Sequence, residues 1–276
     1  KGTPTMGGIS FILATVVALI IAMFIDSSNI KYYFLFIYTT ISFSIIGYID
    51  DMLIVVKKKN DGLAPRKKLM LQILFSIIFY VLVKFIYEDI NYIYIPGLEY
   101  QLNISYLYMV FVVFWQTGFS NAVNLTDGLD GLATSVTIIT TSTFALLAYK
   151  ENNFPVFVFC LVLVGALIGF LLFNKNPAKI FMCDTGSLAL GGILAAISII
   201  LHKEIAFILI GLVYILETLS VIIQVAYFKK TGKRIFKMSP LHHHFELSGY
   251  GEVKTVYLFV IIALISSGVG YFLGVI

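Results

Sequence analysis

Charged residues are scarce in this sequence. Asp, Glu, Lys and Arg make up only 12% of its 276 residues, whereas about a quarter of a typical soluble domain is charged. Cysteine is limited to Cys160 and Cys183, which excludes a disulfide-stapled fold. The hydrophobic share is 59% and is gathered in long runs, which excludes a soluble helical protein with a large core. The chain is therefore an integral membrane protein.

The apolar runs set the fold class. A helix needs about 20 mostly apolar residues to cross a bilayer, whereas barrel strands alternate over about 10 residues. The runs are long and uniform, so we predict an all-α, polytopic bundle of transmembrane helices that forms a single domain over residues 1–276. Because residue 1 is Lys rather than Met, a further span is expected before it. The nine predicted spans are about 7–25, 31–49, 69–87, 106–123, 131–149, 154–173, 185–201, 204–228 and 254–276.

The loops differ in charge on the two sides of the bundle. The loop 88–105 contains Glu88, Asp89 and Glu99 and neither Lys nor Arg. By the positive-inside rule, the basic side faces the cytoplasm. The polar clusters described below lie on that side, whereas a transporter would more often carry them near the membrane midplane. The basic side holds 15 of the 19 Lys and Arg residues, in Lys1, the loops 50–68, 124–130, 174–184 and 229–253, and the adjoining Lys254.

Two adjacent acids, Asp50 and Asp51, end the second span. Neighbouring carboxylates at a membrane boundary repel each other and lose hydration, and a divalent cation or a proton relieves both costs. A solvated helix end is the alternative interpretation. The basic residues that follow, Lys57–Lys59 and Arg66–Lys68, are for the most part typical of a topology signal that attracts anionic lipid.

The stretch NAVNLTDGLDG carries a polar side chain at every third position, in Asn121, Asn124, Asp127 and Asp130. Residues three apart are neighbours on a helix, so the four side chains could line one stripe. Gly128 would let a ligand come close to the backbone. A polar turn whose Asp caps the next helix explains the pattern equally well.

A third polar stretch, FNKNPAKIFMCDTGS, contains Asn174, Phe181 and Asp184. Asp184 directly precedes an apolar helix, where an acid either caps the helix or takes part in chemistry. Phe181 either anchors the chain at the membrane boundary or stacks on a flat base. These residues are candidates for a site that binds a nucleotide.

Histidine is rare but clustered, because His242, His243 and His244 stand together in the most basic loop. Adjacent histidines cannot easily all ligate one zinc ion, whereas imidazole N–H groups can donate to phosphate oxygens. Within the predicted span 204–228, Glu217 and Gln224 lie seven residues apart on one helical face. Ionisable groups inside a span are functional candidates.

Together the clusters bring three kinds of group to the cytoplasmic leaflet. Acids suit Mg²⁺, cations and histidines suit phosphates, and Asn and Phe side chains suit a base or a sugar. This combination indicates phosphoryl transfer between a soluble, nucleotide-activated donor and a membrane lipid.

Six motifs occur in order along the whole chain: KGTPTMGG at 1–8, DD at 50–51, NAVNLTDGLDG at 121–131, FMCDTGSLALGG at 181–192, ETLSVIIQV at 217–225 and PLHHHFE at 240–246. They resemble those of the phospho-N-acetylmuramoyl-pentapeptide transferases, the MraY family within the polyprenyl-phosphate N-acetylhexosamine-1-phosphate transferases. The resemblance implies that UDP-N-acetylmuramoyl-pentapeptide and undecaprenyl phosphate give lipid I and UMP. It also implies Mg²⁺ as cofactor, a homodimer among the lipids of a bacterial cytoplasmic membrane, and no nucleic-acid partner.

The resemblance also assigns roles to residues, and Asp184 takes two of them, as a catalytic acid and as the Mg²⁺ ligand. The implied catalytic residues are Asp50, Asp51, Lys68, Asp184, His242, His243 and His244. The implied donor-binding residues are Asn121, Asn124, Asp127, Asp130, Asn174, Phe181 and Gln224.

Two positions depart from the family pattern. The family often has Lys three residues after the acidic pair, where this chain has Ile54, so Lys57–Lys59 or Lys68 would have to supply that cation. The family usually has Gly before its third catalytic Asp, where this chain has Cys183. A larger side chain there could shift Asp184.

Several alternatives stay open at this stage. The mechanism we favour is direct attack by the lipid phosphate, oriented or deprotonated by Asp50, and a covalent phospho-enzyme is the competitor. The function could instead be that of a sibling transferase that uses UDP-N-acetylglucosamine, although PLHHHFE argues against it. A cation-coupled transporter and a lipid-binding scaffold without chemistry are the remaining candidates.

Overall fold

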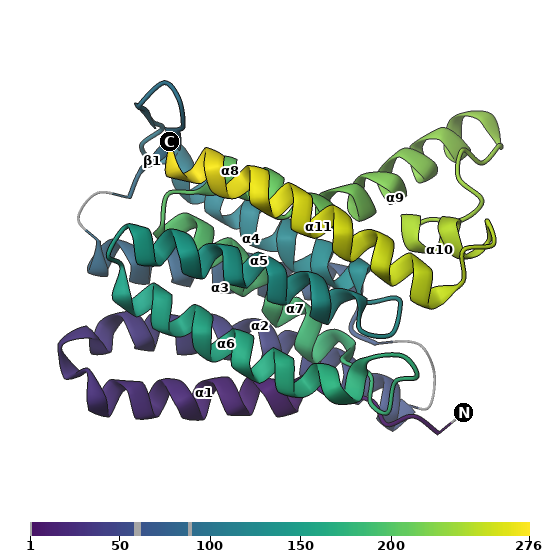
Figure 1. Ribbon diagram of the computed structural model, residues 1–276, viewed down its shortest axis with the longest axis horizontal. Coiled ribbons are helices and arrows are strands. Elements are labelled where there is room, and N and C mark those ends of the chain that lie inside the picture. Colours follow the sequence, from purple (N-terminus) through teal and green to yellow (C-terminus); the bar gives the residue numbers. More distant parts are fainter. Residues whose placement is uncertain (1, 58–61, 88–89) are drawn as a thin grey trace.

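The computed structural model describes residues 2–57, 62–87 and 90–276, so Lys58, Lys59, Glu88 and Asp89 lie outside the described residues. Helices run side by side along the long axis, with the two chain ends at opposite ends of the bundle (Figure 1). The longer helices are α1 (Gly8–Ile25), α2 (Ile30–Lys57), α3 (Pro65–Ile86), α4 (Leu107–Thr126), α5 (Leu132–Lys150), α6 (Phe154–Asn174), α7 (Cys183–Ile200), α9 (Leu212–Thr231) and α11 (Glu252–Val275). The shorter elements are η1 (Ser27–Asn29), β1 (Tyr92–Ile95), β2 (Tyr100–Asn103), α8 (Glu204–Ile210) and α10 (Leu241–Glu246).

The prediction of an all-α membrane bundle is confirmed, but the count of spans changes. Within the described residues, 8 helices are long and apolar enough to cross a membrane. The predicted span 106–123 does form a helix, α4, yet it is not among the eight. Its polar side chains, among them Gln116, Asn121 and Asn124, reduce its hydropathy. The prediction of nine spans is therefore one too many by this measure.

Helix α7 lies at the centre of the bundle. Of its most apolar window, 89% is buried, and its most extensive contacts are with α2 and α4. Small residues make this close packing possible: a Cβ at Gly191 would collide with the backbone carbonyl of Phe119, and one at Gly192 would collide with the ring of Phe43. Small residues at such crossings are the usual way that membrane helices approach each other closely.

The predicted span 204–228 is not one helix. It breaks at Gly211, where the backbone takes φ −95° and ψ 18°, into α8 and α9. Beyond the break α9 turns away from the bundle (Figure 1), and apolar side chains on it such as Ile222 and Phe228 are exposed. Between α4 and the first part of α9 lies an apolar cavity of about 370 Å³.

The end of the bundle opposite α10 carries a small hairpin that the sequence patterns did not predict. Strands β1 and β2 pair antiparallel, with Tyr92 opposite Asn103. The hairpin lies beside the carboxyl terminus (Figure 1), and the Tyr94 hydroxyl donates to the backbone carbonyl of Ile276 at 3.2 Å. The hairpin therefore closes the end of the bundle that is remote from the acidic clusters.

The closest approach of α2 to α7 generates a prediction. A Cβ at Gly47 would overlap the backbone carbonyl of Asp184, so Gly47→Ala must push the two helices apart. We expect a loss of about 1–3 kcal/mol of stability, as for other overpacked cores, seen as a lower midpoint of thermal unfolding in detergent. Gly268→Ala on α11 is the matched control, because a Cβ there meets open space. Equal midpoints for the two variants would contradict the tight α2–α7 contact.

Candidate active site

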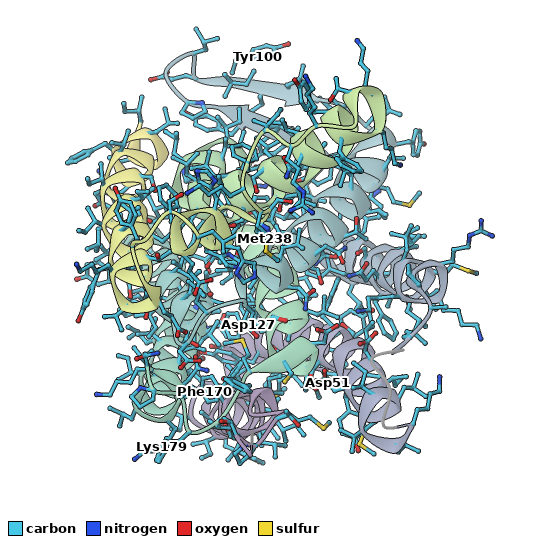
Figure 2. All side chains as sticks on the ribbon, turned by 90° about the vertical axis from the view of Figure 1, so that its right-hand side faces the viewer. Asp51, Tyr100, Asp127, Phe170, Lys179 and Met238 are labelled. Atoms are coloured by element: carbon cyan, nitrogen blue, oxygen red, sulfur yellow. The ribbon has the colours of Figure 1, made fainter. Side chains whose placement is uncertain are left out.

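Three predicted acids come together at the bundle end that carries the amino terminus. Asp50 and Asp51 lie in the last third of α2, and Asp184 lies in the first turn of α7. One carboxylate oxygen from each lies within 4.8 Å of the other two. Asp50 and Asp51 are buried. Figure 2 looks onto this end of the molecule, with Asp127 labelled just below the middle and Asp51 lower and to the right.

Asp51 is a helix cap supplied from a neighbouring helix. It accepts hydrogen bonds from the backbone N–H groups of Asp184 at 3.2 Å and Thr185 at 2.9 Å, and from the Thr185 hydroxyl at 2.5 Å. The first N–H groups of a helix have no partner inside the helix, and their partial positive charge favours a carboxylate. Asp51 therefore fixes where α7 begins, and with it the position of Asp184.

Lys68 joins the other two acids. Its ammonium lies 2.9 Å from Asp50 Oδ1 and 2.7 Å from Asp184 Oδ2. Asn124 donates to the second oxygen of Asp184 at 2.7 Å, and the backbone N–H of Leu63 donates to Asp50 at 3.0 Å. Of the lysines that could replace the cation missing at Ile54, Lys68 is the one that lies at the acids. Of the alternatives, Lys57 is exposed and the other two lie outside the described residues.

The donor set of this cluster fits a hard divalent cation. Three carboxylates and one ammonium leave an excess of negative charge in a small volume, and Mg²⁺ and Ca²⁺ prefer oxygen ligands of this kind. Asp50 and Asp184 present oxygens to the same point, whereas the Asp51 oxygens already accept hydrogen bonds from the first residues of α7. The metal ligand predicted from the sequence, Asp184, is therefore well placed, and Asp50 is its best partner.

A cavity of about 240 Å³ opens beside the acids, and four predicted donor-binding residues line it, namely Asp127, Asp130, Asn174 and Phe181. The ring of Phe181 is 41% exposed, so a flat base could stack on it. The cavity is smaller than the roughly 300 Å³ at which small-molecule sites begin. It can therefore hold one part of a nucleotide-sugar rather than all of it.

Among the described contacts, the Asp127 carboxyl has neither the lysine that pairs with Asp50 and Asp184 nor the several hydrogen bonds that Asp51 accepts, and it accepts from the backbone of Cys183. The pKa of this carboxyl lies well above its usual value, chiefly because burial disfavours the ionised form and next because Asp184 adds negative charge nearby. Asp130 is instead held by its surroundings: it accepts from the backbone N–H of Ala178 at 2.8 Å and from Asn176 at 3.2 Å. Asp127 is thus the acid best placed to meet a ligand in the cavity.

Three predicted donor-binding amides are already engaged within the protein. Asn174 accepts from the Thr134 hydroxyl at 2.6 Å and donates to the backbone carbonyl of Ile180 at 3.0 Å. Gln224 accepts from the backbone N–H groups of residues 235 and 236 and donates to a carbonyl in the same loop. Asn121 donates to Gln72 and to the carbonyl of residue 117. Their roles in donor binding stay predictions; in the structure Asn174 and Gln224 hold loop backbone, and Asn121 joins α4 to α3.

The three histidines have different surroundings. His242 is 1% exposed and lies against Gly128, where a Cβ would collide with Nε2 of its ring. Its Nδ1 lies 3.2 Å from a carboxylate oxygen of Glu217, without the alignment of a hydrogen bond. His243 contacts Glu246 at 2.8 Å, and His244 accepts the backbone N–H of residue 237.

The pairing of Glu217 with His242 is a contact that the sequence patterns missed. Each residue was singled out separately, but they are 25 positions apart and a loop lies between them. The pair supports the turn after α4 from behind, so Gly128 and the cavity residue Asp127 depend on it. The predicted donation from the histidines to phosphate stays a prediction for all three.

The departure at Cys183 has a structural consequence. Its φ is +60°, a left-handed conformation in which a residue with a Cβ is strained and glycine is not. Its thiol accepts the backbone N–H of Met6 at 3.5 Å, and the residue also lines the cavity of Asp127. The chain thus keeps the backbone shape that glycine would favour, and the acidic cluster still forms.

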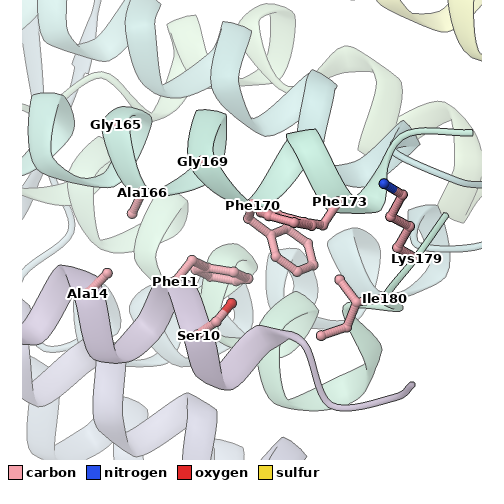
Figure 3. Close-up of a pocket in the computed structure, with 10 residues that line it drawn as sticks. All are labelled: Ser10, Phe11, Ala14, Gly165, Ala166, Gly169, Phe170, Phe173, Lys179 and Ile180. Carbon is pink, nitrogen blue, oxygen red and sulfur yellow. The ribbon is translucent and has the colours of Figure 1, made fainter. Parts of the chain in front are cut away.

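A larger cavity of about 540 Å³ lies away from the acids, between α1 and α6 (Figure 3). Its walls are apolar, with Phe11 and Phe170 packed at 5.3 Å between ring centroids, and Lys179 lies at one end. The residues that line it include no carboxylate, so it is not where the acids act.

The fold and the site define a class of protein. A multi-pass helical bundle that carries a lysine-bridged acidic cluster beside a nucleoside-sized cavity at one membrane face is an integral membrane transferase. The model of glycosyl transferase family 4 matches residues 33–202. Phospho-N-acetylmuramoyl-pentapeptide-transferases from Staphylococcus carnosus and Staphylococcus aureus are 52% and 51% identical to this chain, over 99% of it and 86% of their own length. The chain belongs to the phospho-N-acetylmuramoyl-pentapeptide transferase family within glycosyl transferase family 4.

The raised pKa of Asp127 predicts an unusual effect of pH on stability. The ionised carboxyl is disfavoured in the folded chain, so the associated stability is complete below the ordinary value of 3.8 and is lost as the pH rises through the raised pKa. We therefore expect Asp127→Asn to unfold at a higher temperature than the unaltered chain at pH 8. The difference should shrink as the pH is lowered toward 5.

Asp26 is the matched control of opposite sign. Hydrogen bonds from Ser28 and Asn29 lower the pKa of its carboxyl, so its contribution is present above 3.8 and is lost as the pH falls. Asp26→Asn should not raise the unfolding midpoint at pH 8. If Asp127→Asn and the unaltered chain unfold at the same temperature at both pH values, the assignment to Asp127 is wrong.

Proposed function

We propose that this chain transfers phospho-N-acetylmuramoyl-pentapeptide from its UDP-activated donor to undecaprenyl phosphate, giving lipid I and UMP. The observation that carries the proposal is the junction of two sites: the cluster of Asp50, Asp184 and Lys68 lies beside the cavity that holds Asp127 and Phe181. One site suits phosphates and the other suits a nucleoside. The names of the relatives supply the identity of the transferred group.

The donor would enter with its base in the small cavity. Phe181 would stack on the base, and Asp127 would meet ribose hydroxyls or a ring N–H. Asp130 and Asn174 would hold the loops that form its walls, and Gln224 would hold the separate loop at residues 235 and 236. This placement leaves the pyrophosphate next to the acids, where Asn121 and Asn124 lie on the same face of α4.

The reaction itself needs positioning and charge compensation more than covalent chemistry. Asp50 would orient the lipid phosphate, or take its proton, so that a phosphate oxygen attacks the β-phosphate of the donor. The bond between the two donor phosphates then breaks and UMP leaves. Asp184 and Asp50 would hold Mg²⁺, which when bound supplies positive charge against the phosphates. Lys68 and the histidines 242–244 would add cationic or N–H donors around the same oxygens.

The proposal includes the setting of the enzyme. The protein would lie in a bacterial cytoplasmic membrane. The acidic cluster would face the cytoplasm, because it lies on the same side as the basic loops, which the positive-inside rule places there. The chain would act as one domain over residues 1–276, as a homodimer among membrane lipids and without nucleic acid. A sibling activity on UDP-N-acetylglucosamine is disfavoured by PLHHHFE and by the names of the relatives.

The first test measures UMP release from the UDP-muramoyl-pentapeptide and undecaprenyl phosphate in detergent with Mg²⁺. We expect Asp184→Asn to reduce turnover below detection, because the variant loses a charged ligand and one partner of Lys68. Glu99→Gln, on the exposed hairpin at the far end, is the control and should leave turnover unchanged. Turnover of Asp184→Asn near the unaltered rate would remove the acid from the mechanism. A phosphorylated Asp50 or Asp184 trapped with donor alone would favour the covalent route.

The second test concerns the base. Stacking of a base on an aromatic ring is worth about 1–3 kcal/mol, so Phe181→Ala should weaken UDP binding about tenfold or more, measured by calorimetry, with an unchanged unfolding midpoint. Phe173→Ala is the matched control, because Phe173 is also exposed but lines the cavity between α1 and α6. Equal affinities for the Phe181→Ala chain and the unaltered chain would show that the base binds elsewhere.

A further inference from the structure

The position of the Lys68 ammonium carries a further inference. The ammonium lies between Asp50 Oδ1 and Asp184 Oδ2, at 2.9 Å and 2.7 Å. Among the described contacts, Asp184 Oδ2 has Lys68 as its one partner, whereas Asp50 Oδ1 also accepts the backbone N–H of Leu63 at 3.0 Å. A metal bound by both carboxylates would lie beside these oxygens. The other oxygen of Asp184 accepts from Asn124, and both oxygens of Asp51 accept from the amino end of α7.

An ammonium and a divalent ion cannot share this position. Mg²⁺ takes carboxylate oxygens at about 2.1 Å and Ca²⁺ at about 2.3–2.6 Å, so a bridging ion would stand where the ammonium now stands. Two cations at such a distance repel each other strongly in a partly buried site. The site therefore has room for one of them between Asp50 and Asp184.

Lys68 is the residue of its segment that faces the acids. Arg66 and Lys67, its neighbours in the first turn of α3, have exposed side chains, whereas the Lys68 side chain is 20% exposed and turned inward. A lysine reaches its partners through four flexible carbons and carries a compact charge. The ammonium can leave the carboxylates while the backbone of α3 stays in place.

We propose that Lys68 is an exchangeable counter-charge: it neutralises Asp50 and Asp184 until a divalent cation binds, and the cation then displaces the ammonium from both carboxylates. The inference rests on the metal-dependent part of the proposed function. It gives the lysine a second position, outside the two carboxylates, in which its charge is available to an incoming phosphate.

The first experiment measures Mn²⁺ binding to the metal-stripped chain by electron paramagnetic resonance, without nucleotide or lipid substrate. Lys68→Met keeps much of the side-chain length and removes the competing charge, so it should bind Mn²⁺ about tenfold more tightly than the unaltered chain. In EDTA the same variant should unfold at a lower temperature, and Mn²⁺ should restore it. Lys67→Met, one residue away and exposed, should behave like the unaltered chain in both measurements.

The second experiment uses the unaltered chain, so that it does not depend on the folding of a variant. Reductive methylation followed by mass spectrometry reports which amines are free. Lys68 should be protected in EDTA and should become reactive in saturating Mg²⁺, while the reactivity of Lys67 stays constant.

The outcomes separate the inference from the function on which it rests. Saturable Mn²⁺ binding with equal affinity in Lys68→Met and the unaltered chain overturns the exchange and leaves the metal site intact. Reactivity of Lys68 that does not respond to Mg²⁺ also overturns the exchange, even if Lys68→Met and the unaltered chain differ in affinity for Mn²⁺. A lysine that stays in place would weaken metal binding by charge repulsion alone. An unaltered chain that binds no Mn²⁺ overturns both the exchange and the metal-dependent reaction.

Discussion

The buried amino end of α7 is the constraint on which the site depends. A helix that begins inside a bundle has backbone N–H groups that neither water nor its own turns can satisfy. Asp51 satisfies two of them from α2, and Gly47, one turn earlier on α2, lets the two backbones touch. Asp184 and Asp50 then face each other because their neighbours are locked together. The arrangement of the acids thus follows from how protein groups satisfy the hydrogen bonds of one helix end.

The negative charge of the three acids is also compensated by groups from neighbouring helices. Three acids in a partly buried volume would repel each other and raise the free energy of the fold, and one ammonium from α3 with one amide from α4 reduces that cost. Asp127 lies just outside this arrangement, and its raised pKa is the visible consequence. Binding of a cation or of a hydrogen-bond donor would therefore stabilise the site. A metal-dependent phosphotransferase needs this property.

The helices, their order and the acids could be predicted from the sequence, because apolar length and buried charge are local properties of a chain. The partners could not. Lys68 was singled out by the family resemblance alone, because nothing local distinguishes it from Lys67, and only the packing of α3 turns it inward. The same holds for Glu217 and His242, which meet across a loop, and for Asn174 and Gln224, whose amides the fold uses to hold its own backbone. The break at Gly211 was missed because the sequence is apolar both before it, in α8, and after it, in α9. A prediction from hydropathy therefore joins the two helices into one span.

The break at Gly211 also bears on how the reaction rate would depend on substrate. The cavity between α4 and the first part of α9 is lined almost wholly by apolar side chains, so an apolar chain would reach it from the bilayer rather than from water. For the lipid acceptor proposed above, a lateral route of this kind means that the molecule never leaves the bilayer. Its effective concentration is then a mole fraction in a two-dimensional phase, while the donor is counted in three dimensions. Dilution with detergent or inert lipid would lower the rate at constant total acceptor, as surface-dilution kinetics describes for enzymes that work at an interface.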